Sequence, residues 1–257
     1  RSSDLVPTRL LAVSVIVAII ALVISALRLR TLPLAAASII LAGGLALHAH
    51  IFDGAVFALS LITALLLQIL SNLANDYGDA LSGADNKTRV GPKRAMQSGL
   101  ITQQEMKKAI LLSTGLCVIS GFSLLSVALG DHLYSWLLFL FFGLLAVGAA
   151  ISYTMGRLSY GYRALGDLSV FIFFGLLGVL GSYYLYDLSF NLSLLLPASC
   201  IALLSVAVLN INNIRDMYSD KAAGKTTLVV IFGRNKAFIY HLFLVFSAPL
   251  CAALYLL

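Results

Sequence analysis

Long apolar runs separated by short polar segments are the dominant pattern of this chain. A helix needs about 20 predominantly apolar residues to cross the hydrocarbon core of a bilayer. The runs that reach this length lie at residues 8–27, 32–51, 54–73, 109–130, 133–153, 167–186, 193–211 and 237–257. No segment of about ten residues alternates between apolar and polar positions as the strands of an outer-membrane barrel do. The pattern therefore predicts an all-α fold, a bundle of about eight to nine transmembrane helices.

The composition supports a membrane protein and excludes a soluble one. Of the 257 residues, 60% are hydrophobic and only 11% are charged, whereas a soluble domain carries roughly 25% charged residues. We therefore treat residues 1–257 as one integral-membrane domain with a polar cap and with lipid around it. The three cysteines lie inside apolar runs without a paired spacing, so they indicate neither a disulfide nor a zinc site.

The basic residues predict the orientation of the bundle. Fifteen of the 17 Lys and Arg residues lie in alternate loops, and the opposite loops at 48–53, 131–135 and 187–193 contain none. Because short cytoplasmic loops are enriched in Lys and Arg, we expect the charged side to be cytoplasmic. The net charge of +6 is then explained by topology and by the chemistry of a site, and nucleic acid is excluded as a partner.

Two predicted helices continue directly into clusters of carboxylates. Asp76 and Asp79 are three residues apart, and Asp216 and Asp220 are four apart, so each pair lies on one face of its helix. An asparagine precedes the first aspartate of each pair by four residues, at Asn72 and at Asn212. The two segments therefore share a pattern that resembles a weak internal repeat.

Clustered carboxylates at a membrane surface call for a cation. Oxygen ligands without nearby Cys or His favour magnesium over calcium or manganese. Proteins usually hold Mg²⁺ with one or two carboxylates and with phosphate oxygens of a substrate. Basic residues that would complete a diphosphate site are Lys87, Arg89, Lys93, Arg94, Arg157, Arg163 and Lys225. One acidic loop alone would be read as an ordinary hydrophilic loop; two matching acidic helix ends on one face favour a metal–diphosphate site.

These segments resemble a known family. Asn75-Asp-Tyr-Gly-Asp79 followed by Asp85, together with the later pair Asp216 and Asp220, resembles the two Asp-rich motifs of the UbiA superfamily of intramembrane prenyltransferases. Within this superfamily, further stretches are similar to the enzymes that prenylate 1,4-dihydroxy-2-naphthoate in menaquinone synthesis; they lie at 29–35, 89–99, 153–157, 161–167 and 210–230.

The resemblance implies a reaction and a set of residues for it. A polyprenyl diphosphate would ionise, and a ring carbon of 1,4-dihydroxy-2-naphthoate would attack the allylic cation with loss of CO₂ and a proton, giving demethylmenaquinone in the bacterial inner membrane. The implied Mg²⁺ ligands are Asp76, Asp79, Asp85, Asp216 and Asp220, of which all but Asp85 are also the implied catalytic residues. The implied substrate-binding residues are Asn72, Lys87, Arg94, Tyr153, Arg157, Arg163, Asn212 and Lys225.

Some of these residues also have a plain structural interpretation. Arg157 and Arg163 are accounted for by topology alone, and Tyr153 is typical of an interfacial anchor as well as of a ring that stabilises a cation. Asp167 precedes a predicted helix, and we interpret it as the N-cap of that helix.

Two other functions are compatible with the sequence. A UbiA-type enzyme with a different aromatic acceptor, such as 4-hydroxybenzoate, would carry the same Asp motifs. A transporter would also place acids in its helices, but near the middle of the membrane. Here nearly all the acids lie at the predicted cytoplasmic helix ends, which favours the enzyme.

The first apolar run departs from the family pattern, which usually begins near residues 29–33 and has nine helices. Residues 1–27 are therefore either an additional N-terminal helix before a bundle that ends early, or a segment joined out of order that corresponds to the last helix of the family. Arg1 and Arg9 would flank a cytoplasmic end in the second case, which we favour.

Overall fold

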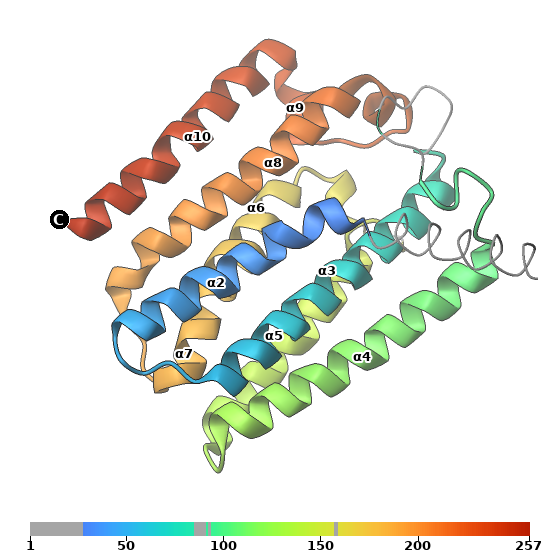
Figure 1. Cartoon of the computed structure of the whole chain (residues 1–257). Coiled ribbons are helices and arrows are strands. Elements are labelled where there is room, and N and C mark those ends of the chain that lie inside the picture. Colours follow the sequence, from blue (N-terminus) through green and yellow to red (C-terminus); the bar gives the residue numbers. More distant parts are fainter. Residues whose placement is uncertain (1–27, 85–90, 92–93, 157–158) are drawn as a thin grey trace, which may run out of the picture.

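The computed structural model describes residues 28–84, 91, 94–156 and 159–257 (Figure 1). The predictions for residues 1–27, Asp85, Lys87, Arg89, Lys93 and Arg157 lie outside these residues. The long helices are α2 (Leu32–His48), α3 (Gly54–Ser82), α4 (Gln103–Leu129), α5 (Leu133–Ser152), α8 (Leu195–Ala222) and α10 (Arg234–Leu256). Shorter helices complete the described part: η1 (Leu29–Thr31), η2 (Tyr160–Tyr162), α6 (Gly166–Val170), α7 (Ser182–Asp187), η4 (Leu192–Leu194) and α9 (Leu228–Phe232). Between α6 and α7 the chain is a π-helix, η3 (Phe171–Gly181).

Local signals set the helix starts. Asp53 caps α3, because its carboxylate accepts hydrogen bonds from the amides of Ala55 and Val56 at 2.7 and 2.9 Å. Thr102 and Glu105 form a capping box at the start of α4, in which each side chain accepts from the backbone amide of the other. Asp53 directly precedes the apolar run at 54–73, whereas the capping box lies several residues before the run at 109–130.

Among the described residues, seven helices are long and apolar enough to span a membrane, and no β-strand is formed. All seven were predicted, and the eighth predicted run lies in residues 1–27. Four of the helices are longer than their apolar runs: α3 ends at Ser82 rather than 73, α4 begins at Gln103 rather than 109, α8 ends at Ala222 rather than 211, and α10 begins at Arg234 rather than 237. A helix keeps its backbone hydrogen bonds after it leaves the hydrocarbon, so hydropathy alone ends it too early.

Helix α2 lies between two sides of the bundle (Figure 1). Helix α2 packs against α3 on one side and against α8 and η3 on the other. Helix α3 also packs against α4 and α5, and α8 packs against α10 (Figure 1). The two helices that carry the acidic motifs therefore belong to different sides of the bundle, and both motifs lie at the end where α2 begins.

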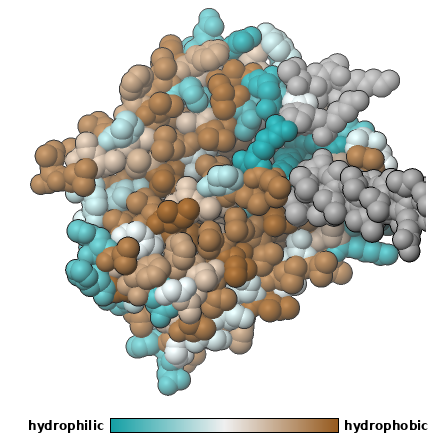
Figure 2. Space-filling model, in the orientation of Figure 1, coloured by the Kyte–Doolittle hydropathy of each residue, from teal (hydrophilic) through white to brown (hydrophobic). Residues whose placement is uncertain are grey.

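The outer surface is as apolar as the interior. Large side chains such as those of Leu111, Ile239 and Phe246 are exposed, while the buried contacts include many small residues and several hydroxyl groups. Figure 2 shows a face that is largely hydrophobic across its middle, with hydrophilic residues gathered toward the ends. An apolar surface of this extent is unfavourable in water, and the hydrocarbon core of a lipid bilayer is the environment that matches it. The chain is a multi-pass membrane protein.

Candidate active site

Four buried carboxylates lie at one end of the bundle. Asp76 and Asp79 belong to the last two turns of α3, and Asp216 and Asp220 to the last two turns of α8. All four are at most 9% exposed. Burial of an ionised carboxylate is costly unless cations and hydrogen-bond donors surround it. The partners of each carboxylate therefore define the chemistry of this end.

Two arginines hold the first motif. Arg28 forms an ion pair with Asp76, and Arg94 forms one with Asp79. Arg94 also donates to the carbonyl oxygen of Asn75 at 3.1 Å, and its Nε lies 3.5 Å from Asp76 Oδ1. Arg94 was predicted for this site and lies in it. Arg28 was assigned only to topology, although it lies beside the 29–35 stretch that carried part of the resemblance.

This environment shifts the pKa of Arg28. Burial lowers the pKa of its guanidinium, and the positive charge of Arg94 lowers it further, while the charge of Asp76 acts in the opposite direction. Two guanidinium groups are thus concentrated beside one buried carboxylate. Such a pair of fixed positive charges is suited to an anion with several oxygen atoms.

The second motif has its own basic partners. Arg215 donates to both oxygens of Asp216, from Nε at 2.9 Å and from Nη2 at 2.6 Å. Lys225, which was predicted for the site, lies beyond the end of α8 with its Nζ 3.7 Å from Asp220 Oδ1. One oxygen of Asp220 and one of Asp76 remain buried acceptors with no hydrogen-bond donor among the described residues. Each motif therefore keeps one oxygen that a cation or a donor from a ligand can take.

A tyrosine connects the two motifs. The hydroxyl of Tyr162 donates to Asp79 Oδ1 at 2.7 Å, and Lys225 Nζ lies 5.5 Å from the centre of its ring. The backbone of Tyr162 also accepts from the amide of Thr226 at 3.1 Å, in a short parallel bridge between the two loops. Burial, followed by the charge of Asp79, raises the pKa of Tyr162, so its phenol stays protonated and remains a donor. Tyr162 was not predicted as a site residue, although it lies in the 161–167 stretch quoted above.

Tyr153 lies within electrostatic reach of both motifs. Burial raises the pKa of its phenol most, and the negative charges nearby, including those of Asp79 and Asp220, raise it further. Its ring packs edge-on against Tyr160 with centroids 5.2 Å apart. A Cβ atom at Gly161 would lie 2.7 Å from the carbonyl oxygen of Tyr153, so only glycine permits this approach. The position agrees with the predicted role of Tyr153 near the reacting centre, a role that stays a prediction.

The predicted asparagines occupy different environments. Asn72 is buried one turn before Asp76, and its amide donates to Thr31 Oγ1 at 2.9 Å. Asn212 is half-buried on α8. Its neighbour Asn213 is buried, and with spacings of three and seven residues it shares the face of Asp216 and Asp220. Spacing favours Asn212, because it precedes Asp216 by the same four residues that separate Asn72 from Asp76, whereas burial favours Asn213.

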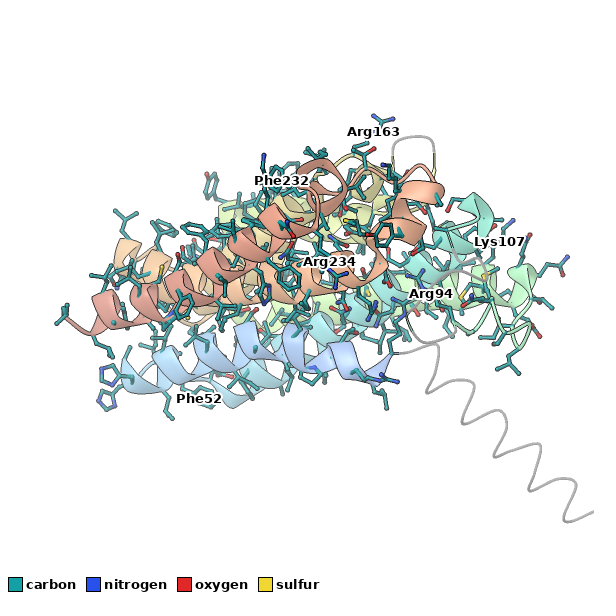
Figure 3. The ribbon with its side chains drawn as sticks, turned by 90° about the horizontal axis from the view of Figure 1, so that it is seen from above. Phe52, Arg94, Lys107, Arg163, Phe232 and Arg234 are labelled. Carbon is teal, nitrogen blue, oxygen red and sulfur yellow. The ribbon has the colours of Figure 1, made fainter. Side chains whose placement is uncertain are left out.

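Arg163 differs from the other predicted cations. Its side chain is exposed and lies at the edge of the molecule in Figure 3, whereas its backbone contributes to the bridge with Thr226. In the same view Arg94 and Lys107 lie toward the opposite end of the bundle from Phe52. The basic residues of the described part are therefore collected at the carboxylate end, but not all of them point into the cluster.

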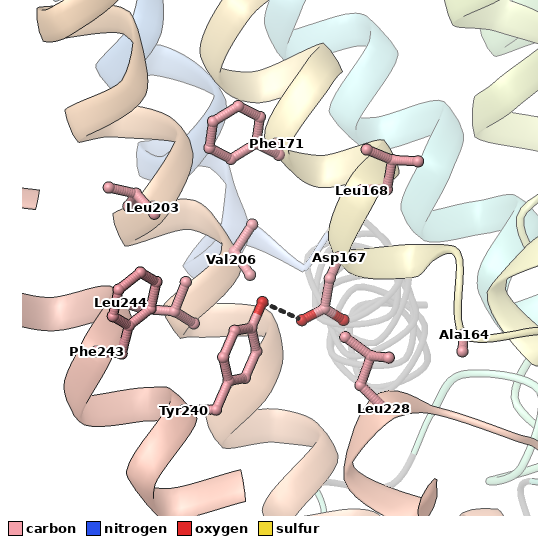
Figure 4. Close-up of a pocket in the computed structure, with 10 residues that line it drawn as sticks. All are labelled: Ala164, Asp167, Leu168, Phe171, Leu203, Val206, Leu228, Tyr240, Phe243 and Leu244. Carbon is pink, nitrogen blue, oxygen red and sulfur yellow. Dashed lines mark hydrogen bonds between the residues drawn. The ribbon is translucent and has the colours of Figure 1, made fainter. Parts of the chain in front are cut away.

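The interpretation of Asp167 as an N-cap is wrong. The N-cap of α6 is Leu165, and Asp167 lies inside the first turn. Its Oδ2 accepts a hydrogen bond of 3.2 Å from the hydroxyl of Tyr240 on α10 (Figure 4). The pair lies in a cavity of about 310 Å³ with mostly apolar walls. A tertiary partner 73 residues away decided the role of Asp167, which local spacing does not reveal.

The arrangement can bind a ligand that carries both signs of charge. The carboxylates offer hard oxygen atoms for a divalent cation, and Arg28, Arg94, Arg215 and Lys225 offer donors for an anion. In the part of the chain that the structure describes, no three His, Cys, Asp or Glu side chains converge on one point as a complete metal site does. A metal ion held by these carboxylates would therefore need further oxygen ligands from a bound substrate to complete its coordination.

Comparison with known proteins agrees with this chemistry. Residues 36–257 match the UbiA prenyltransferase family. The chain is 50% identical to the 1,4-dihydroxy-2-naphthoate octaprenyltransferase of Escherichia coli, over 90% of this chain and 75% of that protein. It is 46% identical to the protein of the same name from Haemophilus influenzae (87% and 73%) and 37% identical to that from Mycobacterium tuberculosis (82% and 69%). The chain therefore belongs to the UbiA prenyltransferase family.

Proposed function

We propose that this protein transfers a polyprenyl group from a polyprenyl diphosphate to 1,4-dihydroxy-2-naphthoate in a Mg²⁺-dependent reaction. The observation that carries the proposal is the pairing of two buried aspartate motifs with four basic side chains at one end of an apolar bundle. The names of the related proteins support the naphthoate as acceptor and an octaprenyl chain as the first donor to test.

The residues present fit a magnesium ion. Mg²⁺ usually takes one or two carboxylates from the protein and completes its coordination with waters and substrate phosphates. Asp76 and Asp79 would serve one side and Asp216 and Asp220 the other, and the unpartnered oxygens of Asp76 and Asp220 are suited to it. When bound, Mg²⁺ supplies charge neutralisation for the diphosphate that leaves.

The protein's own side chains account for the rest of the chemistry. As the bond between the first prenyl carbon and the diphosphate oxygen breaks, negative charge grows on the diphosphate, and Arg28, Arg94, Arg215 and Lys225 are placed to stabilise it. The apolar helices hold the isoprenoid chain and exclude water, which would otherwise capture the allylic cation. The aromatic ring of Tyr153 would stabilise that cation.

The acceptor completes the balance of the reaction. A ring carbon of the dihydroxynaphthoate forms the new carbon–carbon bond, the ionised carboxylate leaves as CO₂, and the electron pair of the broken bond restores the aromatic ring, so that no net proton is released. The product is a prenylated naphthoquinol, which gives demethylmenaquinone on oxidation. Because the Lys and Arg residues gather at the carboxylate end, we place this site at the cytoplasmic face of a bacterial inner membrane.

The test is product formation by the full chain, purified in detergent, from octaprenyl diphosphate and 1,4-dihydroxy-2-naphthoate. We expect a prenylated naphthoquinone with Mg²⁺ and none with EDTA, and activity should return when Mg²⁺ is added back. Product with 4-hydroxybenzoate but not with the naphthoate would move the acceptor and keep the reaction type. Lack of product with every aromatic acceptor would contradict the enzyme and bring a transporter forward.

A further inference from the structure

Gln68 is a buried amide in the membrane-spanning part of α3, and it has no role in the proposed reaction as described above. It is 7% exposed, and its Oε1 has no hydrogen-bond donor among the described residues. Spacings of four, four and three residues place Gln68 on the same face of α3 as Asn72, Asp76 and Asp79. A buried carbonyl without a donor is unusual, and in a functional site it indicates a ligand group that is absent from the protein alone.

The orientation of the Gln68 amide is fixed by its neighbours. Its Nε2 donates to Thr31 Oγ1 at 3.2 Å and to Asn72 Oδ1 at 3.0 Å. The hydroxyl of Thr31 has already donated its one proton to the carbonyl of Arg28 at 3.0 Å. If the amide were turned over, its carbonyl would face two oxygen atoms that have no proton to give. The NH₂ group is therefore held by the protein, and the carbonyl is the group left to receive a ligand.

The ligand group must be a hydrogen-bond donor. Resting on the proposed function, the substrates offer few choices: the isoprenoid chain has no donor, and the diphosphate and an ionised carboxylate are acceptors. The ring hydroxyls of the dihydroxynaphthoate are the donors that remain. We infer that Gln68 Oε1 accepts a hydrogen bond from a ring hydroxyl of the acceptor and so orients the ring toward the first carbon of the prenyl chain.

The position along α3 agrees with this role. Gln68 lies eight residues before Asp76, about 12 Å along the helix axis, and its amide reaches back toward Asn72. The first prenyl carbon is bonded to the diphosphate, so the ring that attacks it must lie next to the diphosphate on the membrane side. The amide of Asn72 lies about one turn, and that of Gln68 about two turns, from the carboxylates in that direction.

The experiment separates acceptor binding from donor binding in steady-state kinetics. With the full chain under reducing conditions, we expect Gln68→Met to raise the KM for 1,4-dihydroxy-2-naphthoate about tenfold, the cost of one buried hydrogen bond. The KM for octaprenyl diphosphate should stay unchanged. Ser60→Ala is the matched control, because Ser60 is also buried on α3 with an unpartnered hydroxyl, two turns farther from the carboxylates, and we expect no change in either KM.

Competing ligands identify the contact directly. We compare 1-hydroxy-2-naphthoate and 4-hydroxy-2-naphthoate, each lacking one ring hydroxyl, as inhibitors. The one that lacks the hydroxyl received by Gln68 should bind about tenfold more weakly than the dihydroxy compound to the wild type, and equally well to Gln68→Met. Burial favours the neutral carboxyl group in Gln68→Glu, which donates one hydrogen bond in place of the NH₂ group and keeps an acceptor oxygen, so this variant should keep the wild-type preference. It carries the test if Gln68→Met does not fold.

Two results overturn the inference. One is a Gln68→Met variant that keeps the preference for both hydroxyls or raises the KM of both substrates alike, as a purely structural role would. The other is a folded Gln68→Glu variant that has lost the preference. A wild type without activity toward the naphthoate contradicts the proposed function itself, whereas an active wild type with an unaffected variant contradicts only the role of Gln68.

Discussion

The hydroxyl of Tyr162 donates a 2.7 Å hydrogen bond to Asp79, and the backbone of the same tyrosine is bonded to Thr226, just past the second aspartate motif. One residue therefore links the end of α3 to the loop that follows α8. The two motifs lie on helices separated by α2, so their relative position depends on such connections. The geometry of the whole site is then set by a loop as well as by the bundle.

Tyr162→Phe removes this hydrogen bond and keeps the ring beneath Lys225. We expect kcat/KM for prenyl transfer to fall about tenfold, because Asp79 loses a donor that orients it. The thermal unfolding midpoint should change little. Tyr134→Phe, at an exposed position in the opposite half of the bundle, serves as the control and should behave as the wild type. Unchanged activity in Tyr162→Phe would show that the bundle alone positions the two motifs.

The two aspartate motifs should respond alike in activity and differently in stability. We expect Asp76→Asn and Asp216→Asn each to lower kcat/KM by at least about a hundredfold, because each removes charge from the proposed metal site. Asp76 is buried against two guanidinium groups, so its loss leaves buried positive charge and should lower the unfolding midpoint. The arginine paired with Asp216 is more exposed, and that variant should melt nearly as the wild type does.

The measurements for these two variants are product formation over a Mg²⁺ titration and thermal unfolding in detergent. Asp131→Asn is the control, because Asp131 is an exposed aspartate in the loop between α4 and α5, away from the cluster. Equal destabilisation of both motif variants would contradict the burial argument. Full activity in either variant would remove that motif from the proposed metal site.

Much of the fold follows from the sequence, and the reason is physical. Hydrocarbon imposes one length and one polarity on every spanning helix, so the seven described spans were predicted from hydropathy alone. The positions of Asp76 and Asp216 at one end also followed, because helix direction alternates across a bilayer. Helices α3 and α8 extend beyond the last residues predicted for them, because a helix does not end where its apolar run ends.

The partners within the site were harder to predict. Arg28 meets Asp76 across 48 positions of sequence, and Tyr162 meets Asp79 across 83. Local spacing reports which residues share a helix face, but it carries no information about which loop covers that face. Gln68 was missed for a related reason, because one amide in a long apolar run scarcely changes the hydropathy. The role of this amide depends on hydrogen-bond partners that η1 contributes.

Arg94 should be sensitive even to replacement by another basic residue. It contacts Asp79, Asp76 and the carbonyl of Asn75 at once, which needs the planar fork of a guanidinium. We expect Arg94→Lys to lower kcat/KM about tenfold or more and to raise the KM for the polyprenyl diphosphate. Arg163→Lys is the matched change at an exposed arginine and should have little effect on either constant. The reverse order of the two variants would indicate that Arg163 binds the diphosphate.

Gly78 should be required for the approach of α3 to the loop after α5. A Cβ atom at this position would lie 2.6 Å from the carbonyl oxygen of Thr154. The hydroxyl of Thr154 in turn donates to the carbonyl of Ala74 at 3.1 Å, so the loop cannot retreat without losing a buried hydrogen bond. We expect Gly78→Ala to destabilise the fold by about 2 kcal/mol and to displace the neighbouring carboxylates, lowering activity at temperatures where the protein is still folded.

The control for this change is Gly44→Ala in α2, where a Cβ atom would meet nothing within 4 Å. Because alanine favours a helix over glycine by about 1 kcal/mol, Gly44→Ala should keep or raise the unfolding midpoint and leave turnover unchanged. Thermal unfolding and product formation are measured on both variants in the same detergent. If Gly78→Ala were as stable and as active as Gly44→Ala, the contact between α3 and Thr154 would not be what holds Asp76 and Asp79 in place.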